Sequence, residues 1–321
     1  MDIALNEVLI WVRLASTSIV AVLLLAVGAA PLIAAVSQHL AKARERIFYD
    51  KFAKQIAQMG LGIGLCTLPF TAGVWAVLYL QHPVANIPAL SHPLLSLPAL
   101  LPFCIYVVGL MLCIVHAANW NRWKGMRFLQ SLFAWVAWLC MLVAGVGLLT
   151  LKRTLNAYPD AFAVDPSLES YLSAVQTIPL QSSLWPFLAL AVFGGLAAAG
   201  TLGALYCLSR RDREDYGRDY YAFALKAASW WGACGGVLAS AAAAGYMLLV
   251  MDRFAGLLQA LPVQTGLAAV VLLLVMALGL LTVAASATPL RRKSTCFLAA
   301  VALFAAGLGL GYPVMCLYTL F

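Results

Sequence analysis

Eight long apolar segments decide what this chain can fold into. A helix that crosses a bilayer needs about 20 mostly apolar residues, and eight stretches meet that length: 8–37, 56–81, 97–118, 128–150, 184–208, 222–250, 266–288 and 295–320. Backbone groups in hydrocarbon must find hydrogen-bond partners within a helix or a closed barrel. The alternating ten-residue strands of a barrel are absent from the sequence. We therefore predict an all-α integral membrane protein with eight transmembrane helices.

The composition agrees with a location in the membrane. Apolar residues make up 64% of the 321 residues, and charged residues only 10%. A soluble domain carries about 25% charged residues, so this chain has too few to cover a surface that faces water. The first apolar segment is too long for a cleavable signal peptide and follows the acidic residues Asp2 and Glu7. We expect it to remain as a membrane anchor.

Basic residues predict the orientation of the segments. Most of the 20 lysines and arginines lie in the connections after the odd-numbered segments: Lys42, Arg44, Arg46, Lys51, Lys54, Arg122, Lys124, Arg127, Arg210, Arg211, Arg213, Arg218, Lys226, Arg291, Arg292 and Lys293. Lysine and arginine are enriched in cytoplasmic loops. These four connections are thus expected in the cytoplasm, with both termini outside. The net charge of +8 is explained by topology rather than by a nucleic-acid partner.

The two halves of the chain follow one plan. Residues 1–150 and 184–321 each contain a helix, a charged turn, a glycine-rich helix, another helix, a short basic turn and a final helix. Because each half has four spans, both halves have the same orientation, as in a parallel repeat around the membrane normal. We predict two four-helix bundles joined by an outer connecting loop at 151–183.

Glycines are concentrated in several of the segments: Gly60, Gly62, Gly64, Gly194, Gly195, Gly200, Gly203, Gly232, Gly235, Gly236, Gly307, Gly309 and Gly311. In a membrane, small residues usually mark places where helices pack closely. A flat porphyrin or quinone ring that approaches a backbone would need the same absence of a side chain. The sequence leaves both interpretations open.

Several classes of chemistry are disfavoured by the placement of ionisable residues. None of the twelve acidic residues lies near the middle of a span, whereas proton relays and ion-coupled transporters usually carry carboxylates there. The eight cysteines form no C-x-x-C pair. This argues against zinc, iron–sulfur and covalently attached haem, and favours buried thiols that serve as small apolar groups.

Five residues are candidates for a functional site. His39 and His116 lie near the cytoplasmic ends of their segments, where two imidazoles at matched depth would ligate a haem b iron. Either could instead be an interfacial residue. Arg13 would bind a haem propionate or a quinone carbonyl, or extend to the outer interface. His82 and His92 lie in an outer loop, where an imidazole accepts a proton from a quinol near neutral pH, or has no special role.

Several short stretches resemble the large subunit of cytochrome bd-type quinol oxidases. The stretches that carry this resemblance are Val12–Ala15, Arg46–Asp50 and Gly60–Thr67 in the first two helices, Trp120–Gly125 in the third connection, and Tyr206–Arg211 with Tyr221–Ala224 around the fifth connection. The resemblance implies the same helical plan, an outer amino terminus and a place in a bacterial inner membrane.

The chain departs from that family where the family binds its haems. The family ligates haem through histidines in the first and fifth helices and a later methionine, but Ala15–Val20 and Ser182–Val192 contain no histidine. The family's paired glutamates are missing from Cys104–Val115. Its long outer quinol loop corresponds here to residues 252–265 alone. We therefore do not expect this chain to reduce oxygen by itself.

The sequence predicts a membrane subunit of a bacterial respiratory or quinone-linked electron-transfer complex. Such a subunit would anchor partner subunits and line a quinol site near Arg13, His82 and His92 at the outer face, and would at most be a quinol-oxidoreductase subunit. One alternative is a cytochrome with a single haem b. Another is a permease for a small molecule or lipid, with a helix break at Pro69 and Thr71.

Overall fold

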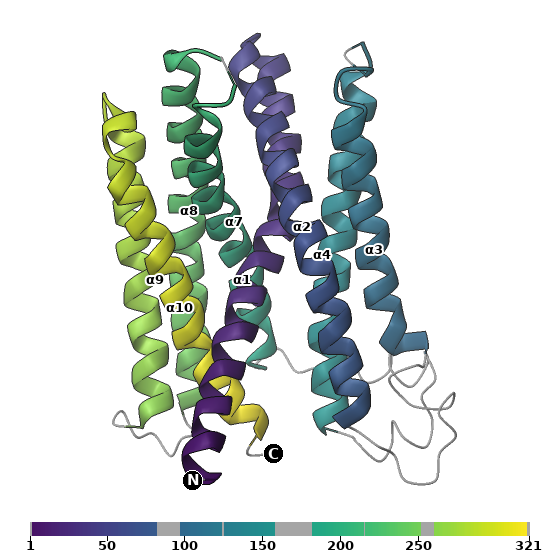
Figure 1. The fold of residues 1–321 in the computed structure, drawn as a ribbon, viewed down its shortest axis with the longest axis vertical. Coiled ribbons are helices and arrows are strands. Elements are labelled where there is room, and N and C mark those ends of the chain that lie inside the picture. The colour runs from purple at the N-terminus through teal and green to yellow at the C-terminus, as the bar shows by residue number, and fades with distance from the viewer. Residues whose placement is uncertain are drawn as a thin grey trace.

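Long helices arranged side by side make up the protein (Figure 1). The structure, a computed structural model, describes residues 2–81, 97–123, 125–157, 182–214, 216–251 and 260–319. In these residues it contains α1 (Asp2–Ala43), α2 (Ile47–Gln81), α3 (Leu97–Ala118), α4 (Arg127–Ala157), α7 (Leu184–Arg210), α8 (Arg218–Met251), α9 (Leu261–Ala285), the short 3-10 helix η4 (Pro289–Arg291) and α10 (Lys293–Thr319), and no strand.

The chain is an all-helical, multi-pass membrane protein. Among the described residues, seven helices are long and apolar enough to cross a bilayer, namely α1, α3, α4, α7, α8, α9 and α10. The remaining long helix, α2, has 35 residues, and a membrane span in it stays a prediction. The all-α membrane class is thus confirmed, while the count of eight spans is not tested.

The helices extend beyond most of the apolar segments. The helix α1 reaches Ala43, six residues past the predicted end at 37, and carries Lys42 in its last turn. A cation there interacts favourably with the helix dipole, and backbone hydrogen bonding continues where hydrophobicity ends. The helix α9 instead stops at Ala285, because Ser286 is extended and Pro289 soon follows.

Four helix hairpins form the bundle. Sequence neighbours pack together in the pairs α1–α2, α3–α4, α7–α8 and α9–α10. The four connecting turns lie at one end of the molecule, and the start of α1 and the end of α10 lie at the other (Figure 1). The charged turns thus lie at the same end of the bundle, as expected when successive helices run in opposite directions. Their location in the cytoplasm stays a prediction, as does the repeat.

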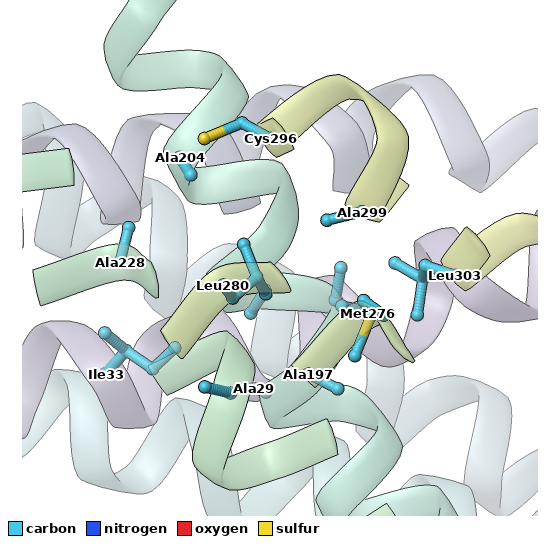
Figure 2. Close-up of a cluster of buried hydrophobic side chains, with 14 of the residues drawn as sticks. Ala29, Ile33, Ala197, Ala204, Ala228, Met276, Leu280, Cys296, Ala299 and Leu303 are labelled. Carbon is cyan, nitrogen blue, oxygen red and sulfur yellow. The ribbon is translucent and has the colours of Figure 1, made fainter. Parts of the chain in front are cut away.

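The largest buried cluster includes residues from both halves of the chain. Side chains of α1 and α2 pack in it with side chains of α7, α8, α9 and α10. Figure 2 shows Ile33 of α1, Ala228 of α8 and Leu280 of α9 within this cluster. The pair α3–α4 packs beside it, through smaller clusters that involve Val27 and Trp120. A division into bundles at 1–150 and 184–321 stays a prediction, and the main core crosses that division between α1 and α7.

Small residues allow the helices of the core to approach each other closely. A Cβ atom added to Gly200 of α7 would meet the backbone of Gly232 of α8, and one added to Gly235 would meet the backbone of Ala197. On α10, a Cβ at Gly309 would lie 2.8 Å from the Thr265 carbonyl oxygen of α9. The prediction of close helix packing is confirmed at these glycines. Gly62 is an exception, because a Cβ atom added there would meet no atom within 4 Å.

Candidate functional site

A buried histidine on α3 has one satisfied and one unsatisfied ring nitrogen. His116 is 3% exposed, and its Nδ1 lies 2.9 Å from the main-chain oxygen of Gln130 on α4. A carbonyl oxygen only accepts hydrogen bonds, so Nδ1 carries the hydrogen, and Nε2 of the neutral ring carries the lone pair. In the described part of the chain this buried Nε2 has no hydrogen-bond partner. His116 therefore offers an unused acceptor inside the protein.

A small cavity lies beside this histidine, between α1, α2, α3 and α4. Its volume is about 10 Å³, and it is lined by Ala30, Pro31, Ala57, Gly60, Leu61, Cys113, His116 and Ala134. A space of this size holds about one water molecule. The walls are almost entirely apolar, so His116 and Cys113 supply the polar side-chain atoms at this place.

A chain of polar contacts joins His116 to the end of the bundle that carries the charged turns. Arg127 Nη1 donates to Gln130 Oε1 at 2.6 Å, and Arg127 Nη2 forms an ion pair with Asp50 Oδ2 at 2.8 Å. The Arg127 guanidinium also lies over the ring of Trp120, 5.5 Å from its centroid. Trp120 in turn packs edge-on against the His116 ring. These contacts fix the α3–α4 hairpin against α2.

His39, the proposed partner of His116, is placed differently. It lies exposed near the end of α1, and its Nε2 accepts a hydrogen bond of 3.0 Å from Trp135 Nε1 on α4. It is not among the residues that line the cavity at His116. A haem between these two histidines does not fit this arrangement, because Nε2 of His39 is occupied and the cavity beside His116 has room for a single water molecule.

The proposed quinol residues lie largely outside the described structure. His82 and His92 fall in the segment 82–96, which is not among the described residues. Arg13 is exposed near the start of the candidate span in α1, which begins at Trp11. The Trp11 ring stacks on Tyr312 of α10 at 5.5 Å between centroids. This exposed position agrees with an arginine that extends to the membrane surface.

The helix break expected at Pro69 is not present. The helix α2 continues from Ile47 to Gln81 with Pro69 inside it. Thr71 lies in the same helix, and its side chain is not among those described. The cysteines expected to be buried differ among themselves: Cys207 and Cys296 are buried, whereas Cys66, Cys104 and Cys234 lie on the protein's outer surface.

A second polar cluster, which the sequence analysis did not identify, surrounds Gln55 of α2. Gln55 is fully buried. Its Oε1 accepts hydrogen bonds from Tyr220 Oη at 2.7 Å and from Cys207 Sγ at 3.5 Å. Its Nε2 donates to Glu214 Oε2 at 2.8 Å. All polar atoms of this amide side chain thus contact the α7–α8 hairpin.

Aromatic rings and charges surround this second cluster. Lys51 Nζ lies 4.7 Å from the centroid of the Tyr216 ring, and Tyr221 Oη donates to the Glu214 main-chain oxygen at 2.8 Å. Burial, together with the nearby Glu214 carboxylate, raises the pKa of Tyr216 above its usual value. The phenol of Tyr216 therefore remains protonated. The hydrogen bonds of Gln55 in this cluster connect α2 to α7 and α8.

One signal in the sequence points to Gln55. The apolar residues Phe52, Ile56 and Met59 recur at helical spacing and are buried in the main cluster. Gln55 falls on the same face of the helix, where an amide needs partners to be buried. The identity of those partners cannot be obtained from this spacing, because Tyr220 lies 165 residues away in the chain.

Neither the comparisons with known proteins nor the arrangement of possible metal ligands assigns a function to the chain. No protein-family model matches the chain, and a comparison with curated proteins finds no match. In the described ranges, no group of three or more histidine, cysteine or acidic side chains is arranged to hold a metal ion. The function must therefore be argued from the chain itself.

Proposed function

We propose that the chain is a scaffold subunit of a quinone-linked respiratory complex in a bacterial inner membrane. In this role its helices hold partner subunits in place, and the chemistry takes place largely on those partners. The main support is the close packing of α7 and α8, where Gly200 meets the Gly232 backbone and Gly235 meets the Ala197 backbone. Helices in such contact form a rigid body, which suits a subunit that positions others.

The polar clusters support the same structural role. Gln55 uses its amide to join α2 to α8, and Arg127 joins α4 to α2. In both clusters the polar group, the Gln55 amide or the Arg127 guanidinium, already forms hydrogen bonds or an ion pair with other residues of the protein. Neither cluster presents an activated nucleophile or a general base to a substrate. These groups therefore stabilise the arrangement of the hairpins.

The connection to quinone chemistry rests on the sequence. The charged turns and the third connection resemble those of the large subunit of cytochrome bd-type quinol oxidases. In our proposal, Arg13 at the outer end of α1 hydrogen-bonds an oxygen of the quinone head group. His82 or His92 accepts a proton as the quinol is oxidised, and the electrons pass to a redox centre on a partner subunit.

A permease is supported less well by the described geometry. Transporters bind substrates near the midplane, commonly at broken helices. Here α2 is uninterrupted at Pro69, and no carboxylate lies near the middle of a span.

Purification of the tagged protein in a mild detergent tests the proposal. We expect it to be isolated with partner subunits that carry a redox cofactor, and with quinone in the organic extract. The variant Arg13→Gln should retain less quinone, whereas Lys293→Gln, which changes an exposed cation at the start of α10, should retain as much as the wild type. A protein that is isolated alone and without quinone would show the proposal to be wrong.

The optical spectrum of the same preparation tests the haem alternative. The arrangement of His39 and His116 does not fit a haem, so we expect no haem b band that depends on these residues. A reduced-minus-oxidised band that is present in the wild type and absent in His116→Ala would instead favour the single-haem cytochrome. Bands that persist in this variant would belong to a partner subunit.

A further inference from the structure

A residue that lines the cavity between α1, α2, α3 and α4 carries a buried acceptor without a partner. Nε2 of His116 is buried and has no hydrogen-bond partner in the described part of the chain, and His116 is one of the residues that line the cavity. Leaving such an atom unpaired is unfavourable, because it has lost its hydrogen bonds to water. A ligand in the cavity that donates a hydrogen bond would satisfy it.

Pro31, another residue of the cavity wall, leaves a carbonyl oxygen of α1 without its helical donor. Proline has no N–H group, so it cannot bond the carbonyl oxygen four residues earlier in the helix. In α1 that carbonyl belongs to Val27, whose side chain is buried. Carbonyl groups point toward the carboxyl end of a helix, and hence toward Pro31, which lines the cavity. Pro31 thus frees one acceptor on α1, about one helical turn before a residue of the cavity wall, and His116 supplies another on α3.

A weak donor completes the set of polar groups. Cys113 precedes His116 by one helical turn on α3 and lines the same cavity. A thiol donates a weak hydrogen bond. Two acceptors and one donor match a single water molecule, which donates two hydrogen bonds and accepts others. Buried waters in proteins typically form about three hydrogen bonds.

We propose that this cavity is a binding site for one internal water molecule. The water donates to His116 Nε2 and to the Val27 carbonyl oxygen, and it accepts from the Cys113 thiol. The volume of about 10 Å³ suits a single water. A metal ion fits less well, because among the described residues His116 and Cys113 are the only ionisable side chains that line this cavity, and structural metal sites need more ligands.

This water has a structural consequence. It connects α1, at the position where proline interrupts its hydrogen bonding, to α3. The connection continues to α4, because His116 Nδ1 donates to the Gln130 main-chain oxygen. The other residues around the cavity are mainly alanine, glycine and proline, which offer little contact area. The water therefore supplies a polar link between the α3–α4 hairpin and α1. This inference is independent of the proposed function.

Solid-state NMR of the full-length protein in lipid bilayers tests the proposal. The chain has four histidines, so labelling histidine with 15N gives few signals, and His116→Gln identifies those of His116. We expect Nε2 to have the chemical shift of a nitrogen with a lone pair and to receive magnetisation from water protons. Absence of this transfer in the wild type would overturn the proposal, without any need for a variant.

Two variants and a metal analysis locate the water. Ala134→Val fills the cavity from α4 and should abolish the transfer to His116 Nε2. The control is Gly62→Ala, which should leave the transfer unchanged because a Cβ atom there meets no atom within 4 Å. Transfer that persists in a folded Ala134→Val protein would show that the water does not occupy this cavity. If the purified protein contains one equivalent of bound metal that is lost in His116→Gln, the site holds a metal ion and the water proposal is wrong.

Discussion

The hairpins α7–α8 and α3–α4 lie in the same bundle but are held together in different ways. In α7–α8 the backbones touch, because Gly200 and Gly232 face each other. In α3–α4 the nearest contacts at glycine are with side chains: a Cβ at Gly109 would lie 3.2 Å from Cys140 Cβ, and one at Gly147 would lie 2.9 Å from Pro102 Cγ. Within the first pair, the small size of the facing residues decides the contact between the helices, whereas within the second pair side chains fill the space between them.

This difference follows from the environment of a membrane helix. Lipid tails are as apolar as leucine, so burial of apolar side chains adds little to helix association. Close backbone contact between helices supplies dispersion energy, and α7, α8, α9 and α10 form one core with α1 and α2. The pair α3–α4 lies beside that core and relies on a few hydrogen bonds and one ion pair. Substitutions should affect the two hairpins differently.

The largest expected effect is that of Gly200→Ala. The added methyl group would meet the Gly232 backbone, which cannot move aside as a side chain can. Overpacking typically costs about 1–3 kcal/mol and occasionally more, so we expect a strongly lowered melting temperature or loss of folded protein. Thermal unfolding in detergent, followed by circular dichroism, measures the change.

The matched control is Gly145→Ala on α4, where an added Cβ would meet no atom within 4 Å. Alanine is favoured over glycine in a helix by about 1 kcal/mol, so this variant should be as stable as the wild type or slightly more stable. Equal melting temperatures for Gly145→Ala and Gly200→Ala would contradict the backbone contact between α7 and α8.

The next effect in size is that of Gln55→Leu. This substitution leaves the buried hydroxyl of Tyr220 and the Glu214 carboxylate without their amide partner. An unsatisfied buried polar group costs about 1–3 kcal/mol, which we expect as a loss in the free energy of unfolding. Adding Tyr220→Phe removes one of the unpaired groups. The double variant should therefore be more stable than the sum of the two single effects, and strict additivity would show that the two residues do not interact.

The class of the fold could be predicted from the sequence, and so could the first and last residues of some helices. The segment 97–118 coincides with α3, because Ala118 is followed by the polar turn residues Asn119 and Asn121. Close packing at Gly200 and Gly235 was one of the two interpretations that the sequence left open, and the structure has the helices in contact at these residues. Local pattern was sufficient wherever the neighbouring residues in the chain decide the structure.

The polar clusters could not be predicted in the same way. Gln55 contacts Tyr220, and His116 contacts Gln130, through folded geometry that links separate helices. Sequence reasoning paired His116 with His39 because both lie near a segment end. Depth along a helix leaves the direction of each side chain undetermined, and here His39 points to Trp135 instead.

A smaller effect is expected for Asp50→Asn, which removes the ion pair with Arg127. The two side chains are 25% and 30% exposed, so water and salt screen the interaction. Such pairs contribute about 0.2–1 kcal/mol, and Arg127 keeps its contacts with Gln130 and Trp120. The destabilisation should decrease when unfolding is measured at high salt. A loss that is independent of salt would show that Asp50 acts through another contact.

The smallest effect is expected for Trp135→Phe, which removes the indole N–H donor to His39. Because His39 is exposed at the end of the bundle, water can replace this donor, and the change in the free energy of unfolding should be about 0.5 kcal/mol or less. The variant His39→Gln, which keeps an acceptor, should be equally mild. A large destabilisation by either substitution would show that this contact, like the glycine contacts of α7–α8, carries much of the helix association. It would then remove the distinction drawn between the two hairpins.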